Sequence, residues 1–253
     1  MNRIAVLCGT GMSTFSKSLS SMVESRSELM FAESEWGEVP IETVSTATGA
    51  VFVIDRHHSP GDSRTPPHAI EHRANVHAAL SCNPDLIVSI NSVGSMIQNM
   101  PPGTIGVGGG LLDLSEKPWT FHDVDAFHSD RTNPFNSYYS DLCVAILAKK
   151  QGSTPSGVVV AQCVGPQFES PQEIDALERL GANVVGMTLG PEQRLISELG
   201  TPHVSLLCSS NWAAGRTPGE PNAEIDHESV DSMASNMRFL VSYCIIRLLG
   251  EGA

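Results

Sequence analysis

The sequence predicts an α/β fold, with a central mixed, largely parallel sheet flanked by helices. Two observations support this prediction. Short apolar, β-branched runs recur along the chain, and amphipathic helical patterns lie between and after several of them. No linker, internal repeat or low-complexity tract divides the 253 residues, so we expect residues 1–253 to form one domain.

The expected strands are short runs rich in Val, Ile and Leu, as is typical of strands buried on both faces. They lie at residues 4–8, 51–54, 86–90, 104–107, 158–163, 184–187 and 204–208. The expected helices lie at residues 69–80, 137–150, 171–180, 192–199 and 227–249. Two helix starts carry capping signals. Ser170, Pro171 and Glu173 form a capping-box pattern, and Asp226 suits an N-cap directly before His227. Residues 115–133 are polar and aromatic without clear periodicity, which indicates a long loop serving a site or an interface.

The composition narrows the classes of partner. A formal net charge of −13 disfavours nucleic acid and anionic membranes, which bind clustered Lys and Arg. No apolar run is long enough for a membrane helix or a secretory signal, so we expect a cytoplasmic protein. The six scattered cysteines form no Cys-x-x-Cys pair and are expected to be reduced core residues.

Polar side chains follow four of the expected strands. Thr10 follows the first, Arg56 and His57 close the second, Ser92 ends the third, and Thr188 precedes a helix start. Hydroxyls, a guanidinium and helix N-terminal amides all suit an anion. The glycines around Thr10 lack the third member of a dinucleotide fingerprint, so the sequence predicts a small anion site instead.

Histidines at 57, 58, 68, 72 and 77 raise the alternative of a metal site, because His68 and His72 are one helical turn apart. No His-Glu-x-x-His motif or convergent carboxylate accompanies them. We therefore expect no bound metal, and a metal-dependent hydrolase remains a competing interpretation.

A series of short motifs occurs in order along nearly the whole chain. They lie at residues 8–11, 56–57, 66–68, 73–75, 91–95, 102–104, 165–170, 173, 181–188 and 191–192. The run from 165 to 192 is the most specific part. This order resembles that of the trimeric purine nucleoside phosphorylases and the methylthioadenosine and methylthioinosine phosphorylases.

The resemblance implies a role for each matched position. The phosphate-site positions are Thr10, Arg56, His57, Asn91, Ser92 and Thr188, with Asn91 also near the pentose. Phe168 and Met187 match residues that pack on base and sugar, while Glu169 and Asn211 match those that bind the purine edge. His227 falls where the family meets the 5′ substituent, although a shift in register would place Ile225 there. His128 matches a residue lent by a neighbouring subunit.

The implied reaction is phosphorolysis of a purine nucleoside to free base and pentose 1-phosphate. Asn211, Glu169 and His57 are the implied catalytic residues, phosphate is a co-substrate, and no cofactor is needed. The implied assembly is a homotrimer, with a hexamer left open. A carboxylate at Glu169 accepts from a ring N–H, and an amide at Asn211 donates to the imidazole nitrogen, which favours a 6-oxopurine such as that of inosine or guanosine.

Three alternatives stay open on the sequence. The chain could be a methylthioinosine or methylthioadenosine phosphorylase, a catalytically inactive nucleoside-binding relative, or the metal-dependent hydrolase. Two segments depart from the family pattern. His58 stands where the family usually has a small glycine and is followed by an unfamiliar loop at 59–65, and residues 212–216 form an unusual loop after Asn211.

Overall fold

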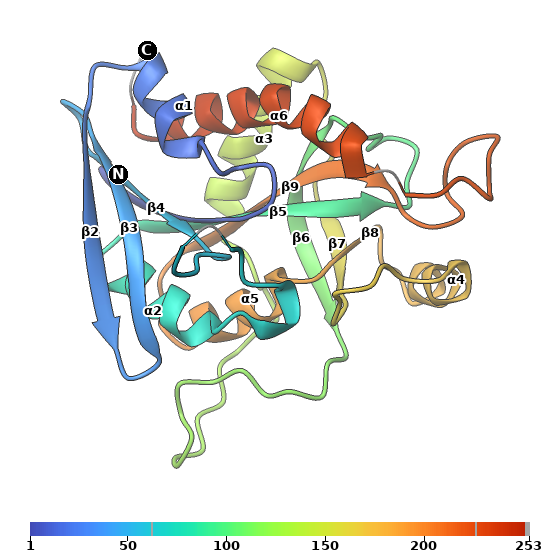
Figure 1. Ribbon diagram of the computed structural model, residues 1–253, viewed down its shortest axis with the longest axis horizontal. Helices are drawn as coiled ribbons and strands as arrows, with labels where there is room; N and C mark the ends of the chain where they lie inside the picture. Colours follow the sequence, from blue (N-terminus) through green and yellow to red (C-terminus); the bar gives the residue numbers. More distant parts are fainter. Residues whose placement is uncertain (62, 226, 251–253) are drawn as a thin grey trace.

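The computed structural model describes residues 1–61, 63–225 and 227–250; the side chains of residues 226–232 are outside the described ones. Within these residues the strands form one mixed sheet of nine, in the order β2-β3-β4-β1-β5-β8-β7-β6-β9 (Figure 1). The strands are β1 (Arg3–Cys8), β2 (Arg26–Ser34), β3 (Gly37–Ser45), β4 (Ala50–Asp55), β5 (Leu86–Ser95), β6 (Ile105–Asp113), β7 (Val158–Gln162), β8 (Val184–Gly186) and β9 (His203–Trp212).

The far end of this sheet closes on itself. β5 pairs with β8 on one side and also with β9, in parallel, on the other. β8 pairs with β7, β7 with β6, and β6 with β9. Together with β5, these strands therefore form a closed ring of five. β1 and β4 extend from the ring as parallel strands, and the antiparallel β2–β3 hairpin completes the open edge.

Helices cover both faces of the sheet (Figure 1). They are α1 (Phe15–Met22), α2 (His72–Ser81), α3 (Ser137–Gln151), α4 (Pro171–Arg179), α5 (Leu189–Ser197) and α6 (His227–Leu248). Helices α1, α3 and α6 pack on one face and α2 and α5 on the other. No helix among the described residues has the length and apolar character needed to cross a bilayer.

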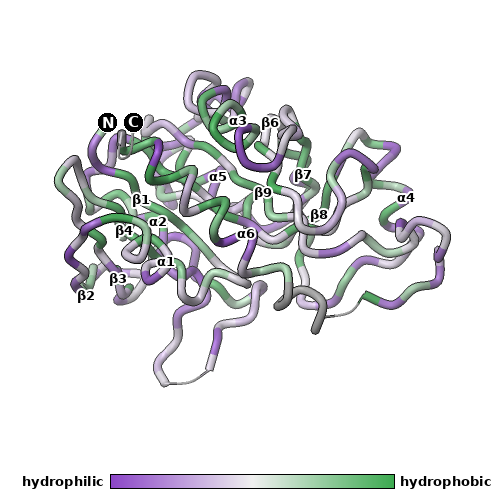
Figure 2. Tube along the Cα trace, turned by 90° about the horizontal axis from the view of Figure 1, so that it is seen from above, coloured by the Kyte–Doolittle hydropathy of each residue, from purple (hydrophilic) through white to green (hydrophobic). Residues whose placement is uncertain are grey.

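Alternation along β1 explains the two cores. Ile4 and Val6 face the cluster with α1, α3 and α6, whereas Ala5 and Leu7 face the cluster with α2 and α5. Successive side chains of a strand point to opposite faces, so a strand buried on both sides is apolar throughout. The hydropathy colouring of Figure 2 agrees, with hydrophobic stretches concentrated in the interior around β1 and α6.

The predicted α/β architecture is confirmed, with three differences. Strands β5, β6 and β9 extend several residues beyond the expected runs. The helix expected at 69–80 is divided into a short 3-10 turn at Pro67–Ala69 and α2, because Glu71 takes an extended conformation and caps α2 through the Arg73 amide. Helix α1 and the β2–β3 hairpin were not predicted; β2 carries an apolar run at 29–32, but it is exposed over most of its length.

Helix α4 begins with the predicted capping box. Ser170 accepts from the Glu173 amide, and the Glu173 carboxylate accepts from the Ser170 amide at 2.7 Å. This cap fixes the backbone directly after Glu169. The second predicted cap, at Asp226, lies outside the described residues.

All six cysteines are free thiols, as the sequence predicts, and all but Cys163 are buried. Burial raises the pKa of Cys8 and of Cys208 to about 12. These thiols therefore stay protonated at neutral pH and behave as small apolar side chains.

Candidate functional site

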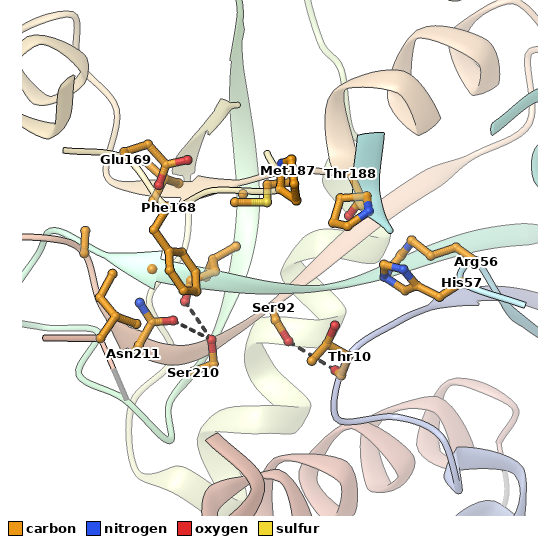
Figure 3. A pocket seen from close by; sticks show the side chains of 18 residues that line it. Thr10, Arg56, His57, Ser92, Phe168, Glu169, Met187, Thr188, Ser210 and Asn211 are labelled. Atoms are coloured by element: carbon orange, nitrogen blue, oxygen red, sulfur yellow. Dashed lines mark hydrogen bonds between the residues drawn. The ribbon is translucent and has the colours of Figure 1, made fainter. Parts of the chain in front are cut away.

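Ends of separate strands meet around one cavity of about 280 Å³ (Figure 3). Its lining comes from the residues after β1 and β4, from the second half of β5, from the β7–α4 and β8–α5 connections, and from the end of β9. The cavity thus lies in the loops that follow strands, where α/β proteins commonly bind ligands. The lining residues are Thr10, Arg56, His57, Pro67, Ser92, Val93, Gly94, Pro166, Phe168, Glu169, Val185, Gly186, Met187, Thr188, Ser210, Asn211, Ala213 and Ile225.

The predicted site residues divide between two ends of this cavity. Figure 3 shows Thr10, Arg56 and His57 toward one end, and Phe168, Glu169 and Asn211 toward the other. The structure therefore brings together, in one cavity, most of the residues that the sequence assigned to phosphate and to purine.

Arg56 is buried and held by protein groups on three sides. Its Nε donates to Glu192 Oε1 at 2.5 Å, and its Nη2 donates to Glu192 Oε2 at 3.2 Å. Nη2 also donates to the Leu7 carbonyl at 2.7 Å, and Nη1 donates to the Ile90 carbonyl at 2.8 Å. A guanidinium carries five N–H donors, so a single N–H on Nη1 remains for a ligand.

The absence of a side chain at Gly9 makes room for this arrangement. A Cβ built there would lie 2.5 Å from Arg56 Nη1 and 3.1 Å from His57 Nε2. Arg56 and His57 can therefore approach the backbone before Thr10 only because residue 9 is glycine.

His57 is fixed as a neutral tautomer. Its Nδ1 lies 2.7 Å from the Thr65 carbonyl, which can only accept, so Nδ1 carries the proton and Nε2 has the free lone pair. Burial, followed by the neighbouring charge of Arg56, lowers the pKa of His57, which keeps the ring neutral at pH 7. Nε2 can accept a hydrogen bond from a protonated oxygen of an anion such as hydrogen phosphate.

Hydroxyl groups complete this end of the cavity. Thr188 is the N-cap residue of α5, but its side chain makes no capping bond; its Oγ1 accepts from Asn91 Nδ2 at 2.9 Å. The hydroxyl proton of Thr188 is thus available to a ligand. Ser92 Oγ donates to the Thr10 carbonyl at 3.1 Å, which ties the loop after β1 to β5.

Asn91 was expected to contact phosphate and pentose, and the structure places it behind Thr188. It is 2% exposed and is not among the residues that line the cavity. In this position its amide orients the Thr188 hydroxyl.

The other end of the cavity presents Asn211 with a defined amide orientation. Its Oδ1 accepts from Ser210 Oγ at 2.8 Å, and its Nδ2 donates to the Trp212 carbonyl at 2.8 Å. Since the Trp212 carbonyl can only accept, the amide atom that faces it must be the nitrogen, which leaves Oδ1 facing the Ser210 hydroxyl. One amide N–H remains for a ligand.

Glu169 lies in the wall between the cavity and a more open hollow beside Cys163 and Glu173. Burial and then the Glu169 carboxylate raise the pKa of the Cys163 thiol, so it stays a neutral donor next to the carboxylate. Phe168 belongs to the same wall and borders both spaces, whereas Met187 lines the cavity. Gly165, with φ +67°, passes so close to Met187 that a Cβ would lie 2.5 Å from its sulfur.

Sequence reasoning missed Ser210, and it gave no role to Pro67, Val93 and Val185, although these three lie within the matched motifs. Ser210 could have been suspected from its place beside Asn211 in the run of small polar residues that ends β9. Val93 and Val185 carry no local signal of their own, because they belong to strands that also look like ordinary core.

Besides Asn91, one described residue of the predicted set lies outside this lining. His128 lies in the exposed loop before α3 and does not line the cavity of its own chain. The side chain of His227 lies outside the described residues, whereas Ile225 does line the cavity.

The departures from the family pattern have structural roles. His58 Nε2 contacts Asn75 Oδ1 at 3.1 Å, and Asn75 Nδ2 donates to the Arg56 carbonyl at 3.2 Å. Arg64 pairs with Asp55 at 2.7 Å, which holds the loop at 59–65 against β4; residue 62 of this loop is outside the described residues. Through its contact with Asn75 of α2, His58 helps to hold the backbone of Arg56 against that helix.

The loop at 212–216 packs against α4. Arg216 contacts Asp175 at 2.7 Å and Glu178 at 2.9 Å. Ala213, within the same loop, lines the cavity. The loop thus fixes one wall of the cavity relative to the helix that follows Glu169.

Comparison with known proteins supports the resemblance stated from the motifs. A family model described as the phosphorylase superfamily matches residues 3–246. A probable S-methyl-5′-thioinosine phosphorylase of Methanothermobacter thermautotrophicus is 32% identical over 98% of this chain and 85% of its own length. A probable 6-oxopurine nucleoside phosphorylase of Thermococcus kodakarensis is 32% identical over 87% of this chain and 83% of its own.

Solved structures share the fold. A methylthioadenosine phosphorylase from an antarctic soil metagenomic library has a TM-score of 0.82 at 19% identity, over 100% of this chain and 88% of the other. The methylthioadenosine phosphorylase of Schistosoma mansoni in complex with adenine has a TM-score of 0.83 at 17% identity, over 99% and 93%. By motif order, fold and sequence match, the chain belongs to the phosphorylase superfamily.

Proposed function

We propose that this protein cleaves the N-glycosidic bond of a 6-oxopurine nucleoside by phosphorolysis, releasing the base and pentose 1-phosphate. One observation carries the proposal: a single cavity has anion donors at one end and the Glu169–Asn211 pair at the other. A nucleoside placed between them has its anomeric carbon facing the phosphate. Relatives named 6-oxopurine nucleoside phosphorylase support the same assignment.

The phosphate end suits the nucleophile. As the bond from C1′ to the purine breaks, positive charge grows on the sugar, by analogy with glycoside hydrolysis. A phosphate held by Arg56, Thr188 and the Thr10 loop supplies both the attacking oxygen and a countercharge. Because these donors are fixed before the substrate arrives, little reorganisation is needed during the reaction.

The purine end suits a 6-oxopurine leaving group. The free N–H of Asn211 can donate to the imidazole nitrogen as negative charge grows there, and the Glu169 carboxylate can accept from the ring N–H. Adenine has an acceptor at that ring position and would face the carboxylate without a proton to share. A site built on such bonds rejects the mismatched base by roughly 10⁴-fold.

The test is base release from inosine, guanosine and adenosine, with and without phosphate, in excess EDTA. We expect release from the two 6-oxopurine nucleosides that needs phosphate or arsenate and survives the chelator. Equal rates in phosphate-free buffer would indicate a hydrolase, and loss of activity in EDTA would indicate a metal enzyme. Binding of hypoxanthine without turnover would identify a non-catalytic nucleoside-binding protein.

A second candidate is a methylthioinosine phosphorylase, and the place of Ile225 favours it. An apolar side chain in the cavity wall suits a methylthio group, whereas a neutral His227 imidazole would suit a 5′-hydroxyl. Relatives named S-methyl-5′-thioinosine phosphorylase include one 32% identical to this chain. Measuring kcat/KM for inosine and methylthioinosine in the parent, in His227→Ala and in Ile225→Asn separates the two. A preference for methylthioinosine that Ile225→Asn abolishes would select the second candidate.

We also propose that the chain self-associates as a homotrimer in which the loop carrying His128 reaches a neighbouring cavity. The loop between β6 and α3 projects away from the sheet (Figure 1). Three of its apolar residues are exposed to solvent: Leu114 is 70% exposed, Val124 93% and Phe127 48%. Sedimentation velocity is the test, and a fully active monomer would reject the assembly.

A further inference from the structure

Glu192 lies behind the phosphate end of the cavity, and neither the motif match nor the proposed reaction assigns it a task. Its side chain is 0% exposed, and it does not line the cavity. The carboxylate contacts Arg56 through both oxygens, at 2.5 Å to Nε and 3.2 Å to Nη2. We propose that Glu192 is the positioning residue of the phosphate site, which fixes the Arg56 guanidinium so that one Nη1 N–H points to the phosphate.

The contacts of Arg56 carry the argument. The Leu7 and Ile90 carbonyls each accept from one terminal nitrogen. These two carbonyls make no contact with the Nε side of the guanidinium. The bidentate carboxylate supplies that third side and sets the plane of the group, as paired Arg–carboxylate contacts do. The remaining Nη1 N–H is then held in one orientation, and Nη1 itself lies 2.5 Å from the place that a Cβ at residue 9 would take.

The position of Glu192 in the chain couples two parts of the site. Thr188 is the N-cap of α5, and Glu192 lies in the first turn of the same helix. One short segment thus presents a hydroxyl to the cavity and a carboxylate behind the guanidinium. A shift of α5 would move the Thr188 hydroxyl and the Glu192 carboxylate together.

A buried ion pair is a weak source of net stability, because desolvation of the two charges offsets much of their attraction. This makes a positioning task a better reason for the pair than stability alone. Positioning and simple charge neutralisation also predict opposite changes in phosphate affinity when Glu192 is replaced. If Glu192 only weakened the field of Arg56, removing its charge would tighten phosphate binding. If it positions Arg56, removing it weakens phosphate binding.

The experiment measures binding of inorganic phosphate to the free enzyme by isothermal titration calorimetry, beside the KM for phosphate and the Kd for hypoxanthine. We expect Glu192→Gln to raise the phosphate Kd by about tenfold, the equivalent of one charge-assisted contact, and to leave the hypoxanthine Kd within about twofold. The matched control is Asp113→Asn, which breaks another carboxylate–arginine pair to α5, at Arg194. We expect it to leave both constants within about twofold.

A double-mutant cycle distinguishes positioning from a general structural effect. In an Arg56→Lys background, we expect Glu192→Gln to change the phosphate Kd by less than about twofold, because its effect passes through the guanidinium. If Glu192→Gln does not fold, Glu192→Asp keeps the charge and withdraws the carboxylate, and we expect the same weakening. A phosphate Kd that is unchanged or lower in the folded variant would overturn the inference.

This inference rests on the proposed phosphate site, and the measurements separate the two. A parent that binds phosphate but releases no base would refute the proposed reaction while leaving Glu192 to be judged by the calorimetry. A parent that does not bind phosphate would overturn both.

Discussion

Replacing Asn211 by Asp tests the purine end by exchanging a single donor for an acceptor. In the parent, Oδ1 accepts from Ser210 and Nδ2 donates to the Trp212 carbonyl, each at 2.8 Å, which leaves one N–H for the base. An aspartate carboxylate has no such N–H and would face the Trp212 carbonyl with a second acceptor. Loss of one preorganised donor to a developing negative charge costs about 2.7–4 kcal/mol, or roughly 10²–10³ in kcat. We expect kcat for inosine to fall by that factor.

The assay is steady-state release of hypoxanthine at saturating phosphate, with thermal unfolding to verify the fold. Ser210→Ala is the graded comparison, because it removes the contact to Oδ1 and keeps the anchor to Trp212. We expect a smaller fall of about tenfold there, equal to one ordinary hydrogen bond. Inosine turnover within about threefold of the parent in a folded Asn211→Asp protein would refute the assigned donor.

Three further predictions concern the phosphate end, the pH dependence and the helix after Glu169. Gly9→Ala places a Cβ 2.5 Å from Arg56 Nη1, so we expect the KM for phosphate to rise while hypoxanthine still binds, as titration of each will show. Burial lowers the pKa of His72 and of His203 from 6.5 to about 3. Both rings protonate first in the unfolded chain, so stability is full above pH 6.5 and falls by about 1.4 kcal/mol per unit for each ring as the pH drops toward 3. Urea unfolding across that range measures the slope, which we expect to fall by about 1.4 kcal/mol per pH unit in His203→Gln. A flat profile in the parent contradicts the burial of both rings. Ser170→Ala removes the cap of α4, and we expect the free energy of unfolding to fall by about 1 kcal/mol in the same assay. An unchanged free energy of unfolding would show that the cap does not stabilise the fold.

The sequence identified the residues that follow strands, because such positions combine two local signals. An apolar run predicts the strand, and the polar residue that ends it marks the loop. Thr10, Arg56, His57 and Thr188 all satisfy this rule, and all four line the cavity. Each could be found without knowledge of its neighbours in space.

Features that depend on pairing between distant segments could not be found this way. The ring that joins β5 to β9 requires two strands separated by more than a hundred residues, and no local pattern encodes it. The β2–β3 hairpin depends on pairing between its two strands, and β2 remains largely exposed although it carries an apolar run at 29–32. For the same reason the sequence did not reveal the supporting roles of Asn91 and Glu192, because their partners Thr188 and Arg56 lie far away along the chain.

The closed ring also explains how the two ends of the cavity keep a fixed separation. Ser92 lies toward the phosphate end of β5, whereas Gly94 packs against the Asn211 amide, 3.2 Å from Nδ2 to a Cβ built there. A strand rises about 3.3 Å per residue, so roughly 7 Å of backbone separates these two positions. The β5–β9 register shifts between Val93 and Gly94, within this interval. Because rigid backbone sets the spacing, we expect substitutions near the end of β9 to alter the proposed purine end without moving the proposed phosphate donors. Under the proposed reaction, changes of substrate are therefore expected at Glu169, Asn211 and Ile225 rather than among the phosphate donors.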